Sequence, residues 1–586
     1  MPAEFDVVVA GAGHNSLVAA AYLTKAGLRC LVLEARDVIG GNTATEELTL
    51  PGYHHDSCST AHNIIQASPT LRYDELNLSE YGLEYIQPDP VVHIPFPDGT
   101  GLTMWHDIDR TVAGFERFSK SDAAAYRQMM DEYDRVKGVF ADSRYTPFGL
   151  GPSLDERLSH HPDGGIWKKR IASSAWDIIQ REFEHPNTRA FMLWMAFMTV
   201  QPPQRSGTGR LAYSLAFGRQ SQSWIIPRGG SGALPTALTR VIEANGGSVV
   251  PGRPVVELIL ENGRCVGVVD GTGEEHRATT AVLSTIHIKH LVDMAPKEAW
   301  GTEFTTGVEE WRGGITLCPA HYATTEAPTY DTPEGKIQPL ASGVTHSVER
   351  MLRIEYDFLS GSLALDDPPL LVLCPTVADP GRAPDGNHTL KVIGFHPYDL
   401  ADGVERWDDV KDDVAAAHLD HLRRYSPNLT NETILASAVK SPLDLERMNP
   451  HNWHGSCHGG DQDIAQMGAF RPVYGWAQHR MPIEGLYQTG ATTHPGPSVS
   501  AGPGRNAAWI MLDDLGIDRG KVFADTGGGR ECADTRSRLP TIRPLGRTCS
   551  RSGRRPTGSS YSSPHGIGTT STRCVATRTG PPSTAG

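Results

Sequence analysis

The first 34 residues contain the pattern that most constrains what this chain can fold into. An apolar segment at residues 5–10 is followed by Gly11 and Gly13, an alanine-rich stretch, and a second apolar segment that ends at Glu34. This order predicts a strand, a tight turn, a helix and a second strand, which is the βαβ unit that binds dinucleotides. Gly11 permits the tight turn, and Gly13 lets the backbone approach a pyrophosphate that faces the N-terminus of the helix.

One position departs from the usual fingerprint, because Ser16 stands where a third glycine is common. Serine is small, so we expect the helix still to pack closely against the strands. Glu34 is expected to accept hydrogen bonds from a ribose, and Arg36 either reaches a phosphate or is a solvated surface residue. The cofactor contacts predicted in this unit are Gly11, Ala12, Gly13, Asn15, Ser16, Glu34, Ala35 and Arg36.

A second glycine pair, Gly40 and Gly41, begins six residues after Glu34. A second pair at this distance suits a second approach of the backbone to a pyrophosphate, and it extends the predicted cofactor contacts to Asn42 and Thr43. The stretch resembles FAD enzymes of the amine oxidase and carotenoid desaturase type. The resemblance implies FAD as the cofactor, not NAD.

Composition narrows the classes of partner and compartment. The formal net charge of −14 argues against nucleic acid as the main partner. Nine cysteines include no CxxC pair, which indicates reduced thiols in a cytoplasm and not a disulfide framework. We expect no signal peptide, since the first strand begins within five residues, and no apolar run reaches the roughly 18–20 residues that span a bilayer. A cytoplasmic location is therefore expected, with peripheral contact with a membrane as a hypothesis.

The C-terminal segment differs from the rest of the chain. Residues 530–586 contain ten arginines, no lysine and two acidic residues, amid many Ser, Thr, Gly and Pro residues. This composition predicts disorder from residue 519 onward. An out-of-frame extension and an arginine-rich arm that binds an anionic partner are both open interpretations.

The middle of the chain alternates helical and strand-like segments. Residues 108–200 are expected to be mostly helical, and residues 190–200 form a short, nearly all-apolar, Met-rich stretch. This stretch is either a buried core helix or a wall of an apolar substrate tunnel. Further on, a glycine turn at residues 229–232 precedes a predicted helix at 233–245. The strands predicted after it are 248–250, 254–261, 264–269 and 281–285.

The last motif covers residues 485–508. It predicts a strand that ends in Gly490, a glycine- and proline-rich loop, and a helix that starts near Arg505. Together with residues 5–43 and 224–269, this block resembles the flavin-dependent phytoene desaturase family, and most of all its branch of pyridine nucleotide-disulphide oxidoreductase domain proteins. The resemblance covers residues 5–518 in order.

The resemblance implies an α/β fold, in which a discontinuous Rossmann-like FAD-binding domain is interleaved with a mixed α+β substrate domain. The implied FAD-binding segments are 1–75, 224–300 and 470–518. The substrate domain would hold residues 76–223 and 301–469, and the tail residues 519–586. The further cofactor contacts implied by the resemblance are the backbone of Val256 at the adenine, and Gly490, Ala491, Pro497, Val499 and Ser500 at the ribityl chain and flavin ring.

The chemistry implied is hydride transfer from a C–H bond to FAD, with oxygen or a quinone as electron acceptor. The expected substrate is hydrophobic, polyene- or prenyl-like. A small polar metabolite such as an amine, or a flavoprotein with mainly an interaction role, are the alternatives. FAD is expected to be non-covalent, since the loop at residues 494–496 has no cysteine where covalent relatives carry one. His494 and His55 are the candidate catalytic residues.

A group of metal-ligand residue types lies at His451, His454, Cys457 and His458. Its spacing allows a zinc site, but no CxxC pair or HxxxH helix supports one. We expect no metal here, and either a loop beside the flavin or structural histidines. The sequence gives no indication of the oligomeric state.

Overall fold

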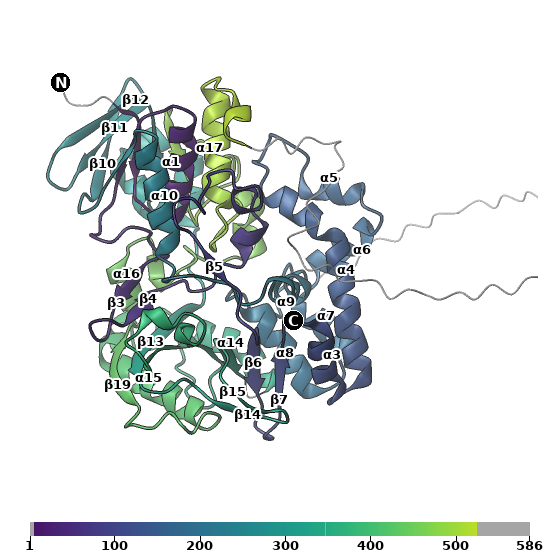
Figure 1. Cartoon of the computed structure of the whole chain (residues 1–586). Coiled ribbons are helices and arrows are strands. Elements are labelled where there is room, and N and C mark those ends of the chain that lie inside the picture. The colour runs from purple at the N-terminus through teal and green to yellow at the C-terminus, as the bar shows by residue number, and fades with distance from the viewer. Residues whose placement is uncertain (1–4, 346, 524–586) are drawn as a thin grey trace, which may run out of the picture. The chain divides into compact units, whose positions relative to one another are not determined.

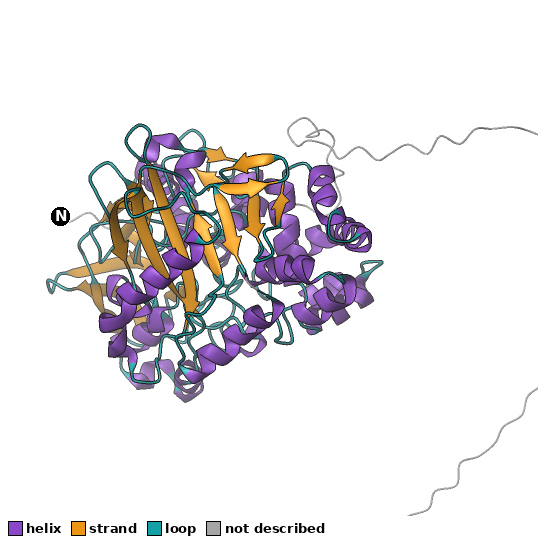
Figure 2. Ribbon diagram, turned by 90° about the horizontal axis from the view of Figure 1, so that it is seen from below, coloured by secondary structure: helices purple, strands orange, loops and turns teal. Residues whose placement is uncertain are grey.

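The structure is a computed structural model that describes residues 5–345 and 347–523 of the chain (Figure 1). Two seven-stranded sheets dominate the described part, and helices lie against both groups of strands (Figure 2). Residues 524–586, which hold most of the predicted disordered tail, lie outside the described residues.

The first sheet contains the predicted βαβ unit. Its strand order is β10-β11-β12-β1-β2-β9, with β20 paired to β12. The pairs β1–β2, β1–β12, β2–β9 and β12–β20 are parallel, while β10–β11–β12 is an antiparallel meander. The strands are β1 (Phe5–Ala10), β2 (Cys30–Leu33), β9 (Ser248–Val250), β10 (Val255–Glu261), β11 (Arg264–Asp270), β12 (Glu275–Ser284) and β20 (Leu486–Gln488). Segments about 480 residues apart in sequence thus share one sheet, as the resemblance implied.

The two faces of this sheet are covered by different helices. Val7 and Val9 of β1 belong to a core shared with α1 (His14–Lys25), α10 (Ala233–Ala244) and α17 (Gly502–Asp514), three helices that Figure 1 shows together. Val8 points to the opposite face, because side chains alternate along a strand. That face packs on the short helices α11 (Ile288–Leu291), α12 (Lys297–Trp300) and α13 (Thr302–Glu309).

Helix α17 begins three residues before the predicted start at Arg505. Pro503 occupies its first turn, where a proline costs no hydrogen bond, and Ala501 enters the helix in the left-handed conformation at φ 60°. The helix crosses α1 so closely that a Cβ added to Gly504 would overlap the carbonyl oxygen of Asn15. This crossing brings the N-termini of α1 and α17 together.

Helix α17 is also fixed by a buried ion pair. The guanidinium of Arg505 donates two hydrogen bonds of 2.8 Å to the carboxylate of Glu75, and both side chains are nearly fully buried. The hydroxyl of Tyr22 in α1 donates to the same carboxylate. Glu75 follows α2 (Pro69–Arg72), so one carboxylate joins three segments of the chain.

The second sheet has the order β19-β13-β18-β17-β16-β6-β7. Its pairs are antiparallel except for β16 with β6. The strands are β6 (Val92–Pro95), β7 (Gly101–Met104), β13 (Thr316–Thr324), β16 (Ala341–Val344), β17 (Leu370–Leu373), β18 (His388–His396) and β19 (Ile434–Val439). Short two-stranded sheets pair β3 (Thr45–Glu47) with β4 (His54–Asp56), β5 (Tyr85–Ile86) with β8 (Ile226–Pro227), and β14 (Tyr330–Thr332) with β15 (Gly335–Ile337).

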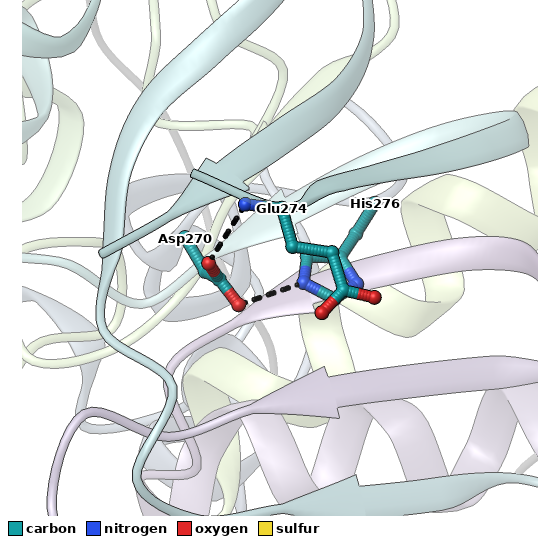
Figure 3. Close-up of side chains that lie close together, drawn as sticks. All are labelled: Asp270, Glu274 and His276. Atoms are coloured by element: carbon teal, nitrogen blue, oxygen red, sulfur yellow. Dashed lines mark hydrogen bonds and ion pairs between the residues drawn. The ribbon is translucent and has the colours of Figure 1, made fainter. Parts of the chain in front are cut away.

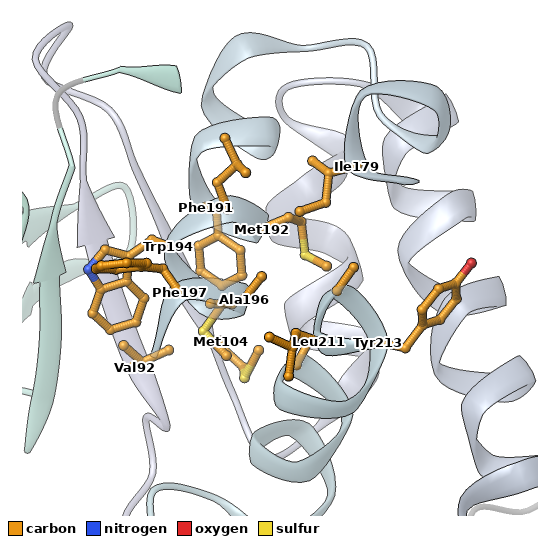
Figure 4. Packing of buried hydrophobic residues seen from close by; sticks show 14 of the residues in the cluster. Val92, Met104, Ile179, Phe191, Met192, Trp194, Ala196, Phe197, Leu211 and Tyr213 are labelled. Atoms are coloured by element: carbon orange, nitrogen blue, oxygen red, sulfur yellow. The ribbon is translucent and has the colours of Figure 1, made fainter. Parts of the chain in front are cut away.

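A layer of helices packs against the second sheet through an apolar core (Figure 4). The Met-rich stretch forms α8, whose residues 190–197 are at most 3% exposed, and Trp194 donates a hydrogen bond of 3.0 Å to the carbonyl of Leu370. This burial is what the core interpretation of residues 190–200 requires. The helices on this side are α3 (Ile108–Glu116), α4 (Lys120–Arg144), α5 (Leu154–Ser159), α6 (Gly164–Ala172), α7 (Ala175–Glu182), α8 (Pro186–Phe197), α9 (Leu211–Gln222) and α14 (Val348–Ser360). Helices α15 (Trp407–Arg423) and α16 (Pro442–Met448) pack in separate apolar clusters with residues of the second sheet.

The described fold extends beyond the predicted boundary at residue 518. Residues 519–521 form a single helical turn, and Val522 and Phe523 are at most 8% exposed. The Phe523 ring stacks on Tyr22 of α1, with 4.7 Å between the ring centroids. The expectation of disorder from residue 519 is therefore wrong for residues 519–523, because the side chains of Val522 and Phe523 pack on the core. In the described part of the chain, no helix combines the length and the apolar character needed to cross a membrane.

Candidate cofactor site

The two predicted glycine turns lie side by side. Gly40 donates a backbone hydrogen bond of 2.8 Å to the carbonyl of Ala12, and Gly13 and Gly40 form an isolated parallel bridge. Gly11 and Gly40 have φ values of 95° and 107°, which strain any residue with a Cβ. A Cβ on Gly41 would lie 3.4 Å from the Cα of Gly13. The structure therefore brings the two turns into backbone contact, as cofactor binding by both requires.

A residue that sequence reasoning missed, Thr285, lies where the first and last cofactor segments meet. A Cβ on Gly11 would approach its Cγ2 to 2.6 Å, and a Cβ on Gly490 would approach its Oγ1 to 2.6 Å. Thr285 directly follows β12, and its amide donates to the carbonyl of Ala10. Its position at the end of an apolar strand was the available signal, since ligands bind at the carboxyl ends of parallel strands.

Ser16 does more than fit in place of a glycine. Its hydroxyl lies 2.6 Å from the carbonyl oxygen of Gly11 and 2.9 Å from that of Gly13, so it bridges the turn from inside the helix. Helix α1 has Gly13 as its N-cap and no side-chain hydrogen bond at that cap. The first-turn N–H groups lack intrahelical partners, as in any α-helix, and point toward the space where an anion would bind.

Glu34 directly follows β2 and is 8% exposed. Its two carboxylate oxygens accept hydrogen bonds from the amides of Ala12, at 2.7 Å, and Arg36, at 3.0 Å. The Arg36 side chain forms a 3.0 Å ion pair with Glu46 and is only 19% exposed, so it is not a solvated surface residue. Ala35, between them, is exposed. The carboxylate is thus held in place at the strand end by backbone groups.

The turn at Gly40–Thr43 is tied to a distant loop. The Thr43 hydroxyl donates to the carbonyl of Gly40 at 2.7 Å. The Asn42 amide nitrogen donates to the side-chain oxygen of Asn452, at 2.7 Å, and to the carbonyl of Cys457, at 3.1 Å. The segment that carries the histidine cluster therefore lies directly beside the second glycine turn.

The last predicted segment packs against α1. Val499 belongs to the α1 core, and the buried Ser500 accepts a hydrogen bond from the amide of Gly502 at 3.1 Å. Ala491 follows Gly490 directly, and Pro497 is buried. Val256, in contrast, is the second residue of β10, the outermost strand of the first sheet, and is 51% exposed. Near Val256, the backbone of Glu34 is hydrogen-bonded to the carbonyl of Val250 and to the amide of Arg253.

Several buried polar atoms of this site have no hydrogen-bond partner in the described part of the chain. Buried polar groups are normally satisfied, so such atoms indicate a missing partner. A dinucleotide with its phosphates, hydroxyls and amide groups offers the donors and acceptors that they lack. The residues present therefore fit FAD. The atoms are Asn15 Oδ1, Arg36 Nη1, Thr489 Oγ1, Thr492 Oγ1 and Asn506 Oδ1.

His494 is partly buried at the edge of this segment. Its ring meets that of Phe148 edge-on, with 4.4 Å between the centroids, and its Nδ1 has no hydrogen-bond partner among the described residues. Burial lowers the pKa of His494 to about 3, so the ring is neutral at physiological pH. A neutral ring can accept or donate a hydrogen bond, whereas it cannot act as a cationic acid. Its catalytic role stays a prediction.

His55 lies in β4 and is 2% exposed. Its Nε2 is 2.8 Å from the Thr49 hydroxyl, and its ring meets that of the buried His321 edge-on at 5.3 Å. Burial, with the nearby cation of Arg382, lowers the pKa of His55 to about 4. The ammonium of Lys391 is close by and donates to the carbonyls of Asp56 and Cys58. The role of His55 also stays a prediction.

The four candidate metal ligands between residues 451 and 458 face different partners. The His451 ring lies 5.6 Å from that of His287, and His454 stacks on Trp453 at 3.9 Å. His458 Nδ1 is 3.3 Å from the side-chain nitrogen of Gln462. These side chains do not converge, so the zinc alternative gains no support. A Cβ on Gly490 would lie 3.6 Å from His451 Cε1, which puts His451 beside the predicted flavin segment.

Within the described residues, one group meets the geometry for a metal ion: Asp270, Glu274 and His276 (Figure 3). These residues flank the turn between β11 and β12. The guanidinium of Arg253 already supplies the cation, at 2.9 Å from Asp270 and 3.0 Å from Glu274. The group is best explained as an ion-paired turn, and we assign it no metal.

Comparison with known proteins agrees with this geometry. The family model described as flavin containing amine oxidoreductase matches residues 17–501. A limonene dehydrogenase polypeptide of Castellaniella defragrans is 28% identical, over 88% of this chain and 96% of that protein. Pyridine nucleotide-disulfide oxidoreductase domain-containing protein 2 of Rattus norvegicus is 26% identical, over 87% and 94%. A lycopene-forming phytoene desaturase of Pantoea ananas is 25% identical, over 86% and 99%.

Solved structures with low identity share the fold. A putrescine oxidase variant with a redesigned cofactor site superimposes with a TM-score of 0.57 at 14% identity, over 88% of this chain and 99% of that one. Cyclohexylamine oxidase of Brevibacterium oxydans gives 0.52 at 15% identity, over 88% and 100%. The predicted α/β fold class with a Rossmann-like parallel sheet is confirmed.

Proposed function

The chain belongs to the flavin-containing amine oxidoreductase family, and from this premise we propose that it dehydrogenates or desaturates a hydrophobic, polyene- or prenyl-like substrate. As a family member it is an FAD-dependent oxidoreductase. The observation that carries the finer proposal is similarity along nearly the whole chain to proteins named for limonene, phytoene and zeta-carotene. All three compounds are hydrocarbons without a charged group.

The residues of the site have distinct tasks in this proposal. Bound FAD supplies an acceptor for a hydride from a substrate C–H bond. Gly11, Gly13 and Gly40 allow the backbone to reach the pyrophosphate, and Ser16 holds the first turn in shape. Glu34 is fixed at the strand end, where it can accept hydrogen bonds from a ribose.

The substrate domain of this proposal contains most of the largest group of buried apolar residues in the described part of the chain. Residues of α4, α8 and α9 form one continuous apolar core with strands β6, β7 and β16 to β18 (Figure 4). Residues 190–197 of α8 are at most 3% exposed, so in this structure they belong to the packed core and do not line an open tunnel.

The alternative substrate, a small amine, is disfavoured if it binds near β4, where two cationic side chains lie. Lys391 is buried with its ammonium bonded to two carbonyls, and Arg382 pairs with Asp56 at 2.9 Å. A protonated amine would be repelled by the Lys391 ammonium, whose hydrogen bonds go to neutral carbonyls. This charge balance favours an uncharged substrate over an amine.

The proposal includes non-covalent FAD, since residues 489–501 contain no cysteine. Acid precipitation would release all of the flavin into the supernatant. It also includes oxygen or a quinone as electron acceptor and a cytoplasmic protein in peripheral contact with membranes. Reoxidation rates with each acceptor, and flotation with liposomes, test these parts separately.

Anaerobic mixing of the purified flavoprotein with defined compounds tests the substrate class. Limonene and phytoene form one set, and putrescine and cyclohexylamine form the other. We expect the blue absorption band of the flavin to bleach only with the first set or its close chemical relatives. Bleaching only by amines would overturn the hydrophobic substrate, and a flavin reducible by dithionite but by no metabolite would favour the interaction role.

A further inference from the structure

Arg471 is a fully buried arginine that nothing in the proposed function yet uses. Its guanidinium donates to four backbone carbonyls. Nε reaches Ala491 at 2.7 Å, Nη1 reaches Asp461 at 3.0 Å and Gln466 at 2.9 Å, and Nη2 reaches His458 at 3.0 Å. A buried charge that is hydrogen-bonded only to neutral groups keeps its full electrostatic effect on its surroundings.

Among the described residues, the charge of Arg471 has no counter-ion in direct contact. The carboxylate of Asp461 pairs with Arg205 at 2.8 Å instead. The guanidinium lies 5.0 Å from the centre of the Trp311 ring. Burial lowers the pKa of Arg471 to about 9, which still leaves it protonated at neutral pH.

The position of Arg471 links it to the predicted flavin segment. Ala491 is one of the residues expected at the flavin, and a Cβ on Gly496 would lie 3.8 Å from the Arg471 Cδ. The other three carbonyls belong to residues 458–466, which directly follow Cys457, whose carbonyl accepts a hydrogen bond from Asn42 of the second glycine turn. Arg471 therefore lies between two loops that both border the cofactor site.

A neutral side chain could join two loops, and burying a cation for that purpose alone costs free energy. A fixed cation stabilises negative charge that develops near it, and negative charge develops on a flavin that accepts a hydride. We propose that Arg471 is a positioning residue that holds residues 490–496 and supplies the positive charge that stabilises the reduced flavin. This inference rests on the proposed binding of FAD by that segment.

The test compares three variants of the flavoprotein: Arg471→Met and Arg471→Gln, which remove the charge, and Arg471→Lys, which keeps it. Arg350→Met is the matched control, because Arg350 is a partly buried arginine of α14 that pairs with Asp357. Two quantities are measured, the midpoint potential of the bound flavin against a reference dye, and the dissociation constant of the sulfite adduct. Sulfite adds negative charge to oxidised flavin and reports the same stabilisation without turnover.

We expect both neutral variants to bind sulfite about tenfold or more weakly and to lower the potential by about 30 mV, the equivalent of tenfold for a two-electron couple. Arg471→Lys and Arg350→Met should stay close to the parent protein. A neutral variant that retains FAD with unchanged potential and sulfite affinity overturns the proposal and leaves the dehydrogenase function intact. If Arg471→Met does not fold, Arg471→Gln decides, because its amide can still donate to the carbonyls. Failure of the parent protein to bind FAD would contradict the proposed function itself.

Discussion

The two halves of the molecule differ in the groups that would contact a ligand, backbone in one and side chains in the other. The half that we propose to bind FAD, the flavin half, is built on the first sheet with α1, α10 and α17. It offers backbone groups, because its glycine turns have positive φ and approach each other within ordinary contact distance. The half that we propose to bind the substrate, the substrate half, is built on the second sheet with α3 to α9 and holds packed apolar side chains. A site made of backbone requires glycine at fixed positions, whereas an apolar wall can be built from many sequences. The cofactor can therefore be predicted from the sequence, whereas the substrate is much harder to predict from it.

The largest effect is expected from the ion pair that fixes α17 in the flavin half. Glu75→Gln leaves the Arg505 guanidinium buried without its carboxylate, which should cost about 3–5 kcal/mol in the free energy of unfolding. Denaturant unfolding measures this loss. The control is Glu484→Gln, which breaks an exposed pair with Arg264 and should cost no more than about 1 kcal/mol. Equal losses in the two variants would mean that the buried pair does not anchor this half.

A packing change in the substrate half should leave the flavin half undisturbed. A Cβ on Gly343 would overlap the indole of Trp194, so Gly343→Ala should destabilise the protein by about 1–3 kcal/mol. FAD affinity should stay unchanged in the part of the protein that remains folded. Gly138→Ala, in an open position of α4, is the control and should not destabilise. A fall in FAD affinity that matches the loss of stability would show that the halves are coupled.

A backbone change at the first turn should act on the cofactor more than on the fold. Gly11→Ala forces a Cβ toward Thr285 at a φ of 95°, and strain of this kind costs about 1–3 kcal/mol. We expect FAD affinity, measured by fluorescence titration of the apoprotein, to fall about tenfold or more. Gly27→Ala has the same kind of φ, 99°, with no atom within 4 Å of the new Cβ. It should lose stability and keep its affinity, and a loss of affinity there would contradict the account.

A smaller effect is expected from acid. Burial lowers the pKa values of His14 and His451 to about 4, and the charge of a protonated His451 would lower that of His14 further. Their pKa values in the unfolded chain are near 6.5, so the unfolded state binds more protons between pH 6.5 and 4. Stability is complete above about pH 6.5 and falls as the pH drops toward 4, so FAD should be released over this range. His451→Gln should shift release to lower pH, and an unchanged release curve would exclude His451 from the effect.

The sequence predicted the flavin half in detail because local chemistry and tertiary role coincide there. Gly11 and Gly40 have positive φ values, a backbone conformation that favours glycine, so the sequence itself marks both turns. The predicted strand at 248–250 and helix at 233–245 lie within one residue of their observed bounds. The sequence did not indicate roles for Arg471, Thr285 and Glu75, because these roles depend on segments that come together only when the chain folds. The Glu75–Arg505 pair, for instance, joins residues 430 positions apart.

The histidine cluster shows a case where residue types and spacing left several interpretations open. His451, His454, Cys457 and His458 have the residue types and spacing of metal ligands, but spacing fixes direction only in a regular helix or strand. Here the chain turns at His454, which has a φ of 50° and directs its ring onto Trp453 and Tyr398. A left-handed histidine is not predictable from spacing, so the divergence of these side chains required the structure.

The central claim is that the flavin half oxidises an apolar compound selected by the substrate half. The most direct test incubates the flavoprotein anaerobically with a lipid extract and, separately, with a water-soluble metabolite extract, and analyses both by mass spectrometry. The account predicts that one lipid species declines and a species lighter by two hydrogens appears, in step with bleaching of the flavin. The same loss of two hydrogens found only in the water-soluble extract would contradict it.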